Sequence, residues 1–187
     1  MRTFEKLVQE SSKTRNNSKH IKVYDNFLNK EQFNKIQNIF CGYEIDWHFS
    51  KTLDEGMHEY GEKYNWQMGH MCYNHDRPLT KYFENIVPIL ASIEEKEPVN
   101  SLIRIKANLN GSTRTNMRSG FHVDFHYEHS RTAIFYVNTN DGYTEFEDGT
   151  KIESKENRIV IFPTLIKHSG VTCTDQQNRV VINFNYF

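Results

Sequence analysis

The stretch Leu102-Ile103-Arg104-Ile105-Lys106-Ala107-Asn108-Leu109-Asn110 decides the fold. From Ile103 onward, apolar side chains at the odd positions alternate with charged or amide side chains at the even positions. Successive side chains of a β-strand point to opposite faces of a sheet, so a period of two predicts a strand. This strand has two chemically distinct faces.

Short apolar runs separated by turn residues follow this strand to the end of the chain. Asn140-Asp141-Gly142 and Asp148-Gly149 mark turns, and the Asp-Gly dipeptide is typical of a type I′ hairpin. The further strands that we expect are 121–126, 132–138, 143–147, 151–152, 159–162 and 179–187. About eight short strands with turn signals predict a jelly roll or a related double sheet.

The first hundred residues carry apolar side chains at helical rather than strand spacing. Asn29 is placed to cap a helix that ends at Gly42, and Phe33, Ile36 and Phe40 form its apolar stripe. This helix is expected to pack on the sheet.

A second apolar helix is expected from about Thr80 to Lys96, with a bend at Pro88. Between the helices, residues 43–77 are rich in aromatics and glycine without a clean period, which fits a substrate-facing lid or an irregular packed cover. We therefore expect one domain over 1–187 of the α+β class, mainly β. Residues 1–100 would supply helical support and the lid region, and 101–187 the β core.

Composition argues against several classes of protein. A net charge of -1 and a pI near 6.8 provide no field that would gather nucleic acid or an anionic membrane. Three cysteines lie far apart without a Cys-x-x-Cys pair, which argues against a disulfide framework or a zinc knuckle. The chain begins without the charged and apolar pattern of a signal peptide and has no apolar stretch of about 18 residues, so we expect a cytoplasmic protein.

His122-Val123-Asp124 and the later His168 are the strongest functional signal. Residues two apart in a strand point to one face, so His122 and Asp124 can reach one metal ion from a single element. His168 follows a separate apolar run and is placed to supply a third ligand. Two imidazoles and a carboxylate on one side of a metal leave the other side open, as non-haem Fe(II) oxygenases need in order to bind oxygen and a co-substrate.

Other histidines offer competing interpretations. With nine His and eight Asp in the chain, a His-x-Asp triplet is expected by chance about 0.4 times, so its context must support it. His126 and Glu128 share the parity of His122 and form an alternative ligand pair, or they are ordinary polar residues near a turn. His70 and His75 lack the partner spacing of a zinc site, which favours a structural role.

Arg179 opens the last strand, whose even positions are apolar and whose odd positions include Asn183 and Asn185. A guanidinium can bind a carboxylate through two parallel hydrogen bonds, so Arg179 beside a metal is suited to hold a dicarboxylate. A buried charge without a partner is costly, so Arg179 on this face implies an anionic partner. The alternative is a surface ion pair with one of the 24 acidic side chains.

These residues, together with the segment Thr132-Ala-Ile-Phe-Tyr136-Val-Asn138 and the closing strand 179–187, resemble the 2-oxoglutarate- and Fe(II)-dependent dioxygenases. The prolyl 4-hydroxylase-like branch is the nearest, and the specific motifs cover residues 100–187. The resemblance implies a double-stranded β-helix (jelly roll) of about eight core strands buttressed by N-terminal helices. It also implies that Fe(II) is held by His122, Asp124 and His168.

The same resemblance assigns the co-substrate contacts. The far carboxylate of 2-oxoglutarate falls on Arg179, with Tyr136 as its hydrogen-bond partner. Thr132 and Asn138 share the parity of Tyr136 and are expected to line the same pocket. The first core strand offers one further contact, from Asn108 or Asn110.

The reaction implied by the resemblance consumes O2 and 2-oxoglutarate, releases succinate and CO2, and hydroxylates an unactivated C–H bond, with ascorbate as a reductant. Asp124 favours hydroxylation, because related halogenases lack this carboxylate. A peptide, with peptidyl proline as the first choice, or a small molecule would be the substrate. The alternatives are a non-catalytic or cupin-type metal-binding jelly roll and a nucleic-acid demethylase of the same superfamily.

Overall fold

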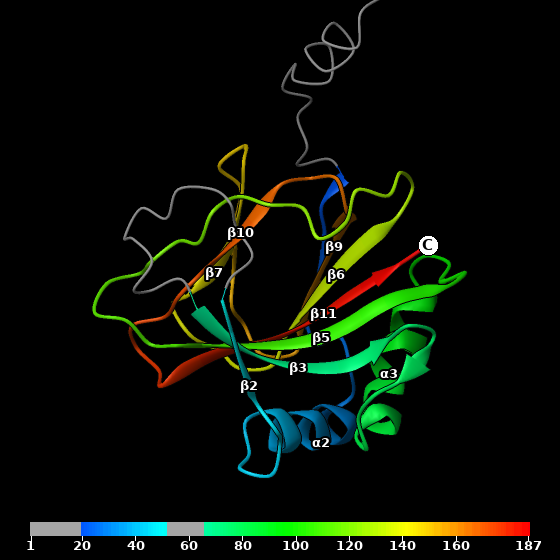
Figure 1. The fold of residues 1–187 in the computed structure, drawn as a ribbon, viewed down its shortest axis with the longest axis horizontal. Coiled ribbons are helices and arrows are strands. Elements are labelled where there is room, and N and C mark those ends of the chain that lie inside the picture. Colours follow the sequence, from blue (N-terminus) through cyan, green and yellow to red (C-terminus); the bar gives the residue numbers. More distant parts are fainter. Residues whose placement is uncertain (1–19, 52–65) are drawn as a thin grey trace, which may run out of the picture.

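The computed structural model describes residues 20–51 and 66–187 (Figure 1). The helices are α2 (Lys30–Phe40) and α3 (Phe83–Glu94). The strands of the first half are β1 (Lys22–Tyr24), β2 (His48–Lys51), β3 (Trp66–Asn74) and β4 (Arg77–Pro78). The strands of the second half are β5 (Leu102–Gly111), β6 (Arg131–Tyr136), β7 (Tyr143–Phe146), β8 (Lys151–Glu153), β9 (Arg158–Pro163), β10 (His168–Val171) and β11 (Asn178–Tyr186).

These strands form two antiparallel sheets. The large sheet has the order β1-β9-β6-β11-β5-β3-β2, with β4 paired to β3, and the small sheet has the order β10-β7-β8. Figure 1 shows the small sheet on one side of the large sheet and both helices on the other side. The chain is therefore a mainly β jelly roll supported by helices, as the strand pattern predicted. No helix in the described part of the chain has the length and apolar character of a membrane span.

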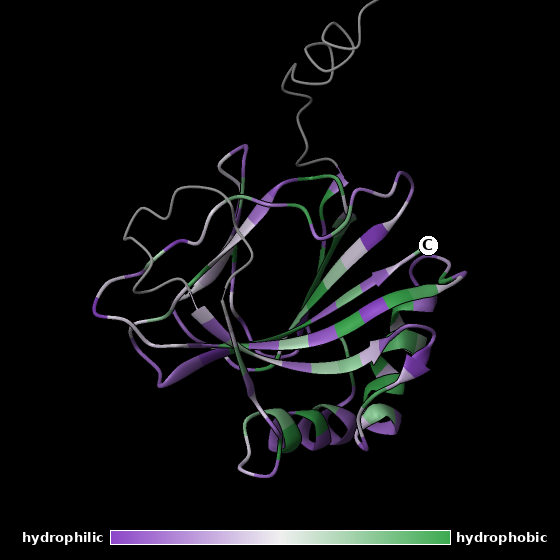
Figure 2. Ribbon diagram, viewed as in Figure 1, coloured by the Kyte–Doolittle hydropathy of each residue, from purple (hydrophilic) through white to green (hydrophobic). Residues whose placement is uncertain are grey.

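The alternation along β5 and β11 places apolar side chains on one face of the large sheet and polar side chains on the other. Figure 2 shows hydrophobic and hydrophilic residues along these strands. Ile105 and Ala107 of β5 and Ile182 and Phe184 of β11 are fully buried in the core shared with the helices. The intervening residues of both strands face the small sheet. The polar face that the sequence predicts for β5 therefore lines the space between the two sheets.

Helix α2 forms as its sequence predicts. The side chain of Asn29 accepts a hydrogen bond of 3.0 Å from the backbone N–H of Gln32, which satisfies one of the free N–H groups of the first turn. Phe33, Ile36 and Phe40 are buried against the sheet. The cap and the apolar stripe together fix the helix on the outer face of β5 and its neighbours.

The expectation of helices and a lid region without strands in the first half is wrong, because β1 to β4 all precede residue 100. The period of β3 is hidden by His70, a polar residue at a buried position. Its Nδ1 lies 2.8 Å from the carbonyl oxygen of Asp46 and its Nε2 lies 2.9 Å from Oγ1 of Thr80. These bonds compensate its burial, so the structural interpretation of His70 is confirmed.

The expected lid of residues 43–77 is only partly described. Its segments 48–51, 66–74 and 77–78 are strands of the large sheet rather than an irregular cover, and residues 52–65 lie outside the described part. The expected helix over 80–96 begins at Phe83 and contains Pro88 within its length.

Two local predictions in the second half are also wrong. Residues 121–126 form no continuous strand and contribute one isolated bridge, between His122 and His168. The β7–β8 turn is not type I′, because Gly149 adopts a positive φ of 84° while Asp148 does not. The N–H of Gly149 instead bonds to the carbonyl of Phe146 at 2.9 Å, and the N–H of Phe146 bonds to the carbonyl of Thr150 at 2.9 Å.

Candidate metal centre

His122 and His168 lie opposite each other through an isolated antiparallel bridge. The N–H of each residue donates to the carbonyl oxygen of the other at 3.0 Å. Directly opposed residues of an antiparallel pair project their side chains to the same side. The two imidazole centroids are accordingly 4.8 Å apart.

Backbone carbonyls fix the orientation of both imidazoles. Nδ1 of His122 lies 3.2 Å from the carbonyl oxygen of Gly120, and Nδ1 of His168 lies 3.3 Å from that of Ile166. A carbonyl only accepts, so these bonds require the proton on Nδ1, which puts the lone pair of each ring on Nε2. Burial lowers the pKa of His168 to about 4, which keeps its ring neutral near pH 7.

The carboxylate of Asp124 lies close to the two imidazoles. Its Oδ1 lies 3.9 Å from Nε2 of His122 and 3.3 Å from a guanidinium nitrogen of Arg104, and its Oδ2 accepts a hydrogen bond of 2.8 Å from Asn185. Burial alone would raise the pKa of Asp124, but His168, Arg104 and the Asn185 bond outweigh it and lower that pKa. Asp124 is therefore a carboxylate at neutral pH.

The structure brings all three predicted ligands together. One ligand atom from each of His122, Asp124 and His168 lies within 4.8 Å of the others, the only such group of three among the described residues. The competing residues His126 and Glu128 are exposed and do not join it. An open-sided set of two imidazoles and one carboxylate suits a divalent transition metal.

A cavity of about 180 Å³ opens beside this cluster, between the two sheets. Strands β5 and β11 supply most of its floor, and the segment 119–124, β7 and β10 cover it. The residues that line it are Gln67, Arg104, Lys106, Asn108, Asn110, Ser119, His122, Val123, Asp124, Ile134, Thr144, His168, Gly170, Arg179, Val181 and Asn183. The polar face predicted from the Leu102–Asn110 stretch therefore becomes a cavity wall.

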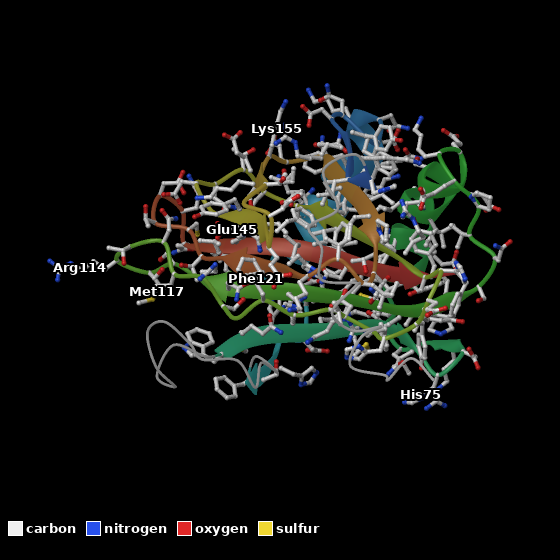
Figure 3. All side chains as sticks on the ribbon, turned by 90° about the horizontal axis from the view of Figure 1, so that it is seen from above. His75, Arg114, Met117, Phe121, Glu145 and Lys155 are labelled. Atoms are coloured by element: carbon white, nitrogen blue, oxygen red, sulfur yellow. The ribbon has the colours of Figure 1, made fainter. Side chains whose placement is uncertain are left out.

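The segment before His122 contacts the small sheet through Arg118. Its guanidinium lies 4.5 Å from the ring centroid of Phe121 and 3.8 Å from Oε2 of Glu145 on β7. Phe121 and Glu145 are both labelled in Figure 3. These contacts help to hold the metal-site segment, which lacks a strand of its own.

Arg179 lies deep in the cavity and is only 3% exposed. Its Nε donates to Oγ of Ser154 at 2.8 Å, and a terminal nitrogen donates to Oγ1 of Thr144 at 3.0 Å. No carboxylate in the described part of the chain forms an ion pair with it, so the surface ion pair considered from the sequence is not formed there. A guanidinium keeps its proton even when buried, so Arg179 is a cation whose hydrogen-bond partners in 20–51 and 66–187 are neutral groups.

The other residues expected around the co-substrate are not equally placed. Tyr136 is fully buried behind the wall, and its hydroxyl donates to Oγ1 of Thr144 at 2.8 Å, so it meets the cavity through Thr144. Thr132 and Asn138 do not line the cavity. Thr132 donates to Thr164, and the side-chain oxygen of Asn138 accepts from the N–H of Val180.

Two amides of the cavity wall have unsatisfied oxygens. Oδ1 of Asn108 and Oδ1 of Asn183 are buried, and no described residue is their hydrogen-bond partner. Buried polar atoms in native proteins nearly always have a partner, so each unpaired amide marks a place where a bound molecule would complete the network. Asn108, one of the two candidates from the first core strand, thus faces the space between Arg179 and the cluster.

Several site residues were not identified from the sequence. Thr144 on β7 and Ser154 just after β8 hold Arg179, yet a hydroxyl at such a position has no distinguishing pattern. Asn185 supports Asp124, and its position on the polar face with Arg179 was the one available signal. Arg104 contacts both Asp124 and Asn185 from the stretch that decides the fold.

Comparison with known proteins gives a fold but no sequence relative. No family model matches the chain, and no curated protein matches it. An oxidoreductase of the 2OG-Fe(II) oxygenase family from Burkholderia pseudomallei has a TM-score of 0.63 at 8% identity, over 89% of this chain and 85% of that chain.

Two prolyl hydroxylase structures are also similar. The viral collagen prolyl hydroxylase of Paramecium Bursaria Chlorella virus-1, solved with 2OG, has a TM-score of 0.57 at 11% identity, over 89% of this chain and 95% of that chain. A prolyl hydroxylase from Trichoplax adhaerens, solved with a hypoxia inducible factor peptide fragment, has a TM-score of 0.59 at 10% identity, over 100% and 94%. At these identities the likeness shows a common jelly-roll fold.

Proposed function

We propose that this protein is a 2-oxoglutarate- and Fe(II)-dependent oxygenase that hydroxylates a C–H bond. One observation supports this function above all: His122, Asp124 and His168 converge in the same cavity as a buried arginine that lacks a carboxylate partner. The solved structures that share the fold are 2OG-Fe(II) oxygenases, which agrees with this proposal.

The donor set fits Fe(II). His122 and His168 would bind the ion through Nε2, since their Nδ1 atoms face backbone carbonyls, and Asp124 would bind it through a carboxylate oxygen. The Asn185 bond and the Arg104 contact fix the orientation of Asp124 before metal binding. Bound iron would supply the oxidising chemistry that splits O2 between 2-oxoglutarate and a C–H bond.

The cavity also fits a dicarboxylate. Arg179 would receive the far carboxylate of 2-oxoglutarate, with Thr144 beside it and Tyr136 holding Thr144 in place. Ile134 and Val181 form apolar wall between Arg179 and the cluster, so they exclude water from the bound chain. The unpaired amides of Asn108 and Asn183 are placed to bond its polar atoms.

The work of the protein in such a reaction is placement. Arg179 at one end and the three ligands at the other define a fixed line for the co-substrate, and the substrate C–H bond must approach from the open side. Because O2 chemistry belongs to the iron, the surrounding residues decide which bond is oxidised. A peptidyl proline is the first substrate class to test, because two structures of the same fold are prolyl hydroxylases.

Succinate formation tests the function. Wild-type protein with Fe(II), ascorbate and 2-oxoglutarate should produce succinate, slowly alone and faster with a substrate peptide. Asp124→Ala should abolish it, because two imidazoles alone leave the iron poorly held. No succinate from wild type under any of these conditions would leave a non-catalytic metal-binding jelly roll as the function.

A further inference from the structure

Lys106 lines the same cavity but has no role in the function proposed above. It occupies the position on β5 between Arg104 and Asn108, with its side chain on the polar face of the strand. Residue 106 is half-buried, so solvent and solutes can still reach its ammonium.

The ammonium of Lys106 has no partner in the described residues. No hydrogen bond or ion pair within 20–51 and 66–187 reaches its Nζ, whereas the neighbouring Arg104 pairs with Asp124. Burial, followed by repulsion from Arg104, lowers the pKa of Lys106, and the smaller effect of attraction to Asp124 does not compensate. A half-buried cation without a counter-charge is unfavourable unless a bound group supplies one.

The backbone beneath Lys106 is shaped for this side chain. A Cβ atom at Gly69 of β3 would lie 2.8 Å from Cε of Lys106 and 3.4 Å from its Nζ. The end of the lysine side chain therefore lies against Gly69 on the neighbouring strand β3. This contact places the ammonium beside β3, on the wall of the cavity that Lys106 lines.

Among the described residues, the charges of the cavity wall do not balance without a further anion. Its wall carries three cations, Arg104, Lys106 and Arg179, and one carboxylate, Asp124. Asp124 pairs with Arg104, and the far carboxylate of 2-oxoglutarate would pair with Arg179. The near carboxylate would be taken by the metal, which leaves Lys106 as the cation without a counter-charge.

We propose that the substrate carries a carboxylate and that Lys106 receives it at the open part of the cavity. This inference rests on the proposed function, because it assigns the two carboxylates of 2-oxoglutarate to Arg179 and the metal. An acidic peptide side chain and a small organic acid share this chemistry. Lys106 is thus a specificity-determining residue that selects acidic over neutral substrates.

Thermal unfolding of protein loaded with Mn(II) and saturating 2-oxoglutarate provides the test. Two sets of probes are added: short peptides that each hold one Asp, and free monocarboxylic acids. Each acid is measured beside its own amide, which has nearly the same shape and no charge. A ligand that binds only the folded state raises the midpoint, so the midpoint difference between acid and amide measures recognition of the charge.

Wild type should respond to acids of one set and not to their amides, and the responding set identifies the substrate as peptide or small molecule. Lys106→Met should lose this preference while it keeps the full midpoint increase caused by 2-oxoglutarate. Lys106→Arg should retain part of the preference. The matched control Lys35→Met removes an exposed lysine of α2, whose side chain is 62% exposed, and should behave as wild type.

The outcomes separate the two proposals. No midpoint increase with 2-oxoglutarate in wild type contradicts the proposed function itself. A normal increase together with equal responses to acids and amides contradicts the assignment of Lys106. Loss of the 2-oxoglutarate increase in Lys106→Met also contradicts it, since Lys106 would then bind the co-substrate.

Discussion

The fully buried side chain of Asn185 connects the metal ligands to the last strand, and its truncation should weaken both stability and metal binding. Its amide N–H groups donate to Oδ2 of Asp124 at 2.8 Å and to Oγ1 of Thr132 at 3.0 Å. Its oxygen accepts from Arg104 at 3.1 and 3.3 Å. Asn185→Ala therefore removes contacts with two charged groups at once.

The expected size follows from these contacts. A hydrogen bond to a charged group contributes roughly 1.5–3 kcal/mol, and an unsatisfied buried carboxylate oxygen adds to the loss. Arg104 is partly exposed and keeps its contact with Asp124, so the lower part of the summed range applies, about 3 kcal/mol. For a domain of this size that corresponds to a fall of roughly 6–12 °C in the unfolding midpoint. Loss of a partner behind a metal ligand weakens metal binding by about 10–100-fold.

Calorimetric titration with Mn(II) and thermal unfolding measure the two effects. Asn183→Ala is the matched control, because Asn183 is the previous cavity-facing residue of β11 and its oxygen bonds to none of the described residues. This control should bind Mn(II) as wild type does and lose less stability. If Asn185→Ala binds Mn(II) with wild-type affinity and has the same unfolding midpoint as Asn183→Ala, the proposed support of Asp124 is refuted.

Three further outcomes are expected. Arg179→Met should abolish the midpoint increase that 2-oxoglutarate causes with Mn(II) present while it leaves Mn(II) binding intact; an unchanged increase removes Arg179 from the site. Gly142→Ala should weaken 2-oxoglutarate binding measured by calorimetry, because its Cβ would lie 2.8 Å from Cδ of Arg179. Burial would raise the pKa of Glu97, but Arg131 and its other partners lower it below the ordinary 4.5. Glu97 therefore stabilises the fold fully above pH 4.5, and this stabilisation is lost as the pH falls through the lower pKa of the folded state. Urea unfolding at a series of acidic pH values should therefore show a steeper loss in wild type than in Glu97→Gln, and parallel curves would contradict this assignment.

The parts of the fold that the sequence predicts are those where burial differs sharply between faces. Strands β5 and β11 alternate cleanly because one face packs against the helices and the other lines a polar cavity. Strand β3 was missed because His70 occupies a buried position and Gly69 leaves space for Lys106. Both residues break the period for reasons that only the three-dimensional contacts reveal.

The candidate site shows a similar division. His122, Asp124 and His168 are found from residue type and order, although the segment 121–126 is not the strand that was expected to align them. The isolated bridge between His122 and His168 of β10 and the hydrogen bond from Asn185 to Asp124 align the ligands instead. The hydroxyls around Arg179 carry no sequence signal, because Ser and Thr occur at many surface positions as well.

Anomalous diffraction from crystals grown with Mn(II) and 2-oxoglutarate tests the central claim most directly. The account predicts one anomalous peak at coordination distance from Nε2 of His122, Nε2 of His168 and a carboxylate oxygen of Asp124, with the 2-oxoglutarate chain running from it to Arg179. A peak elsewhere, or no peak between these three side chains, would contradict it.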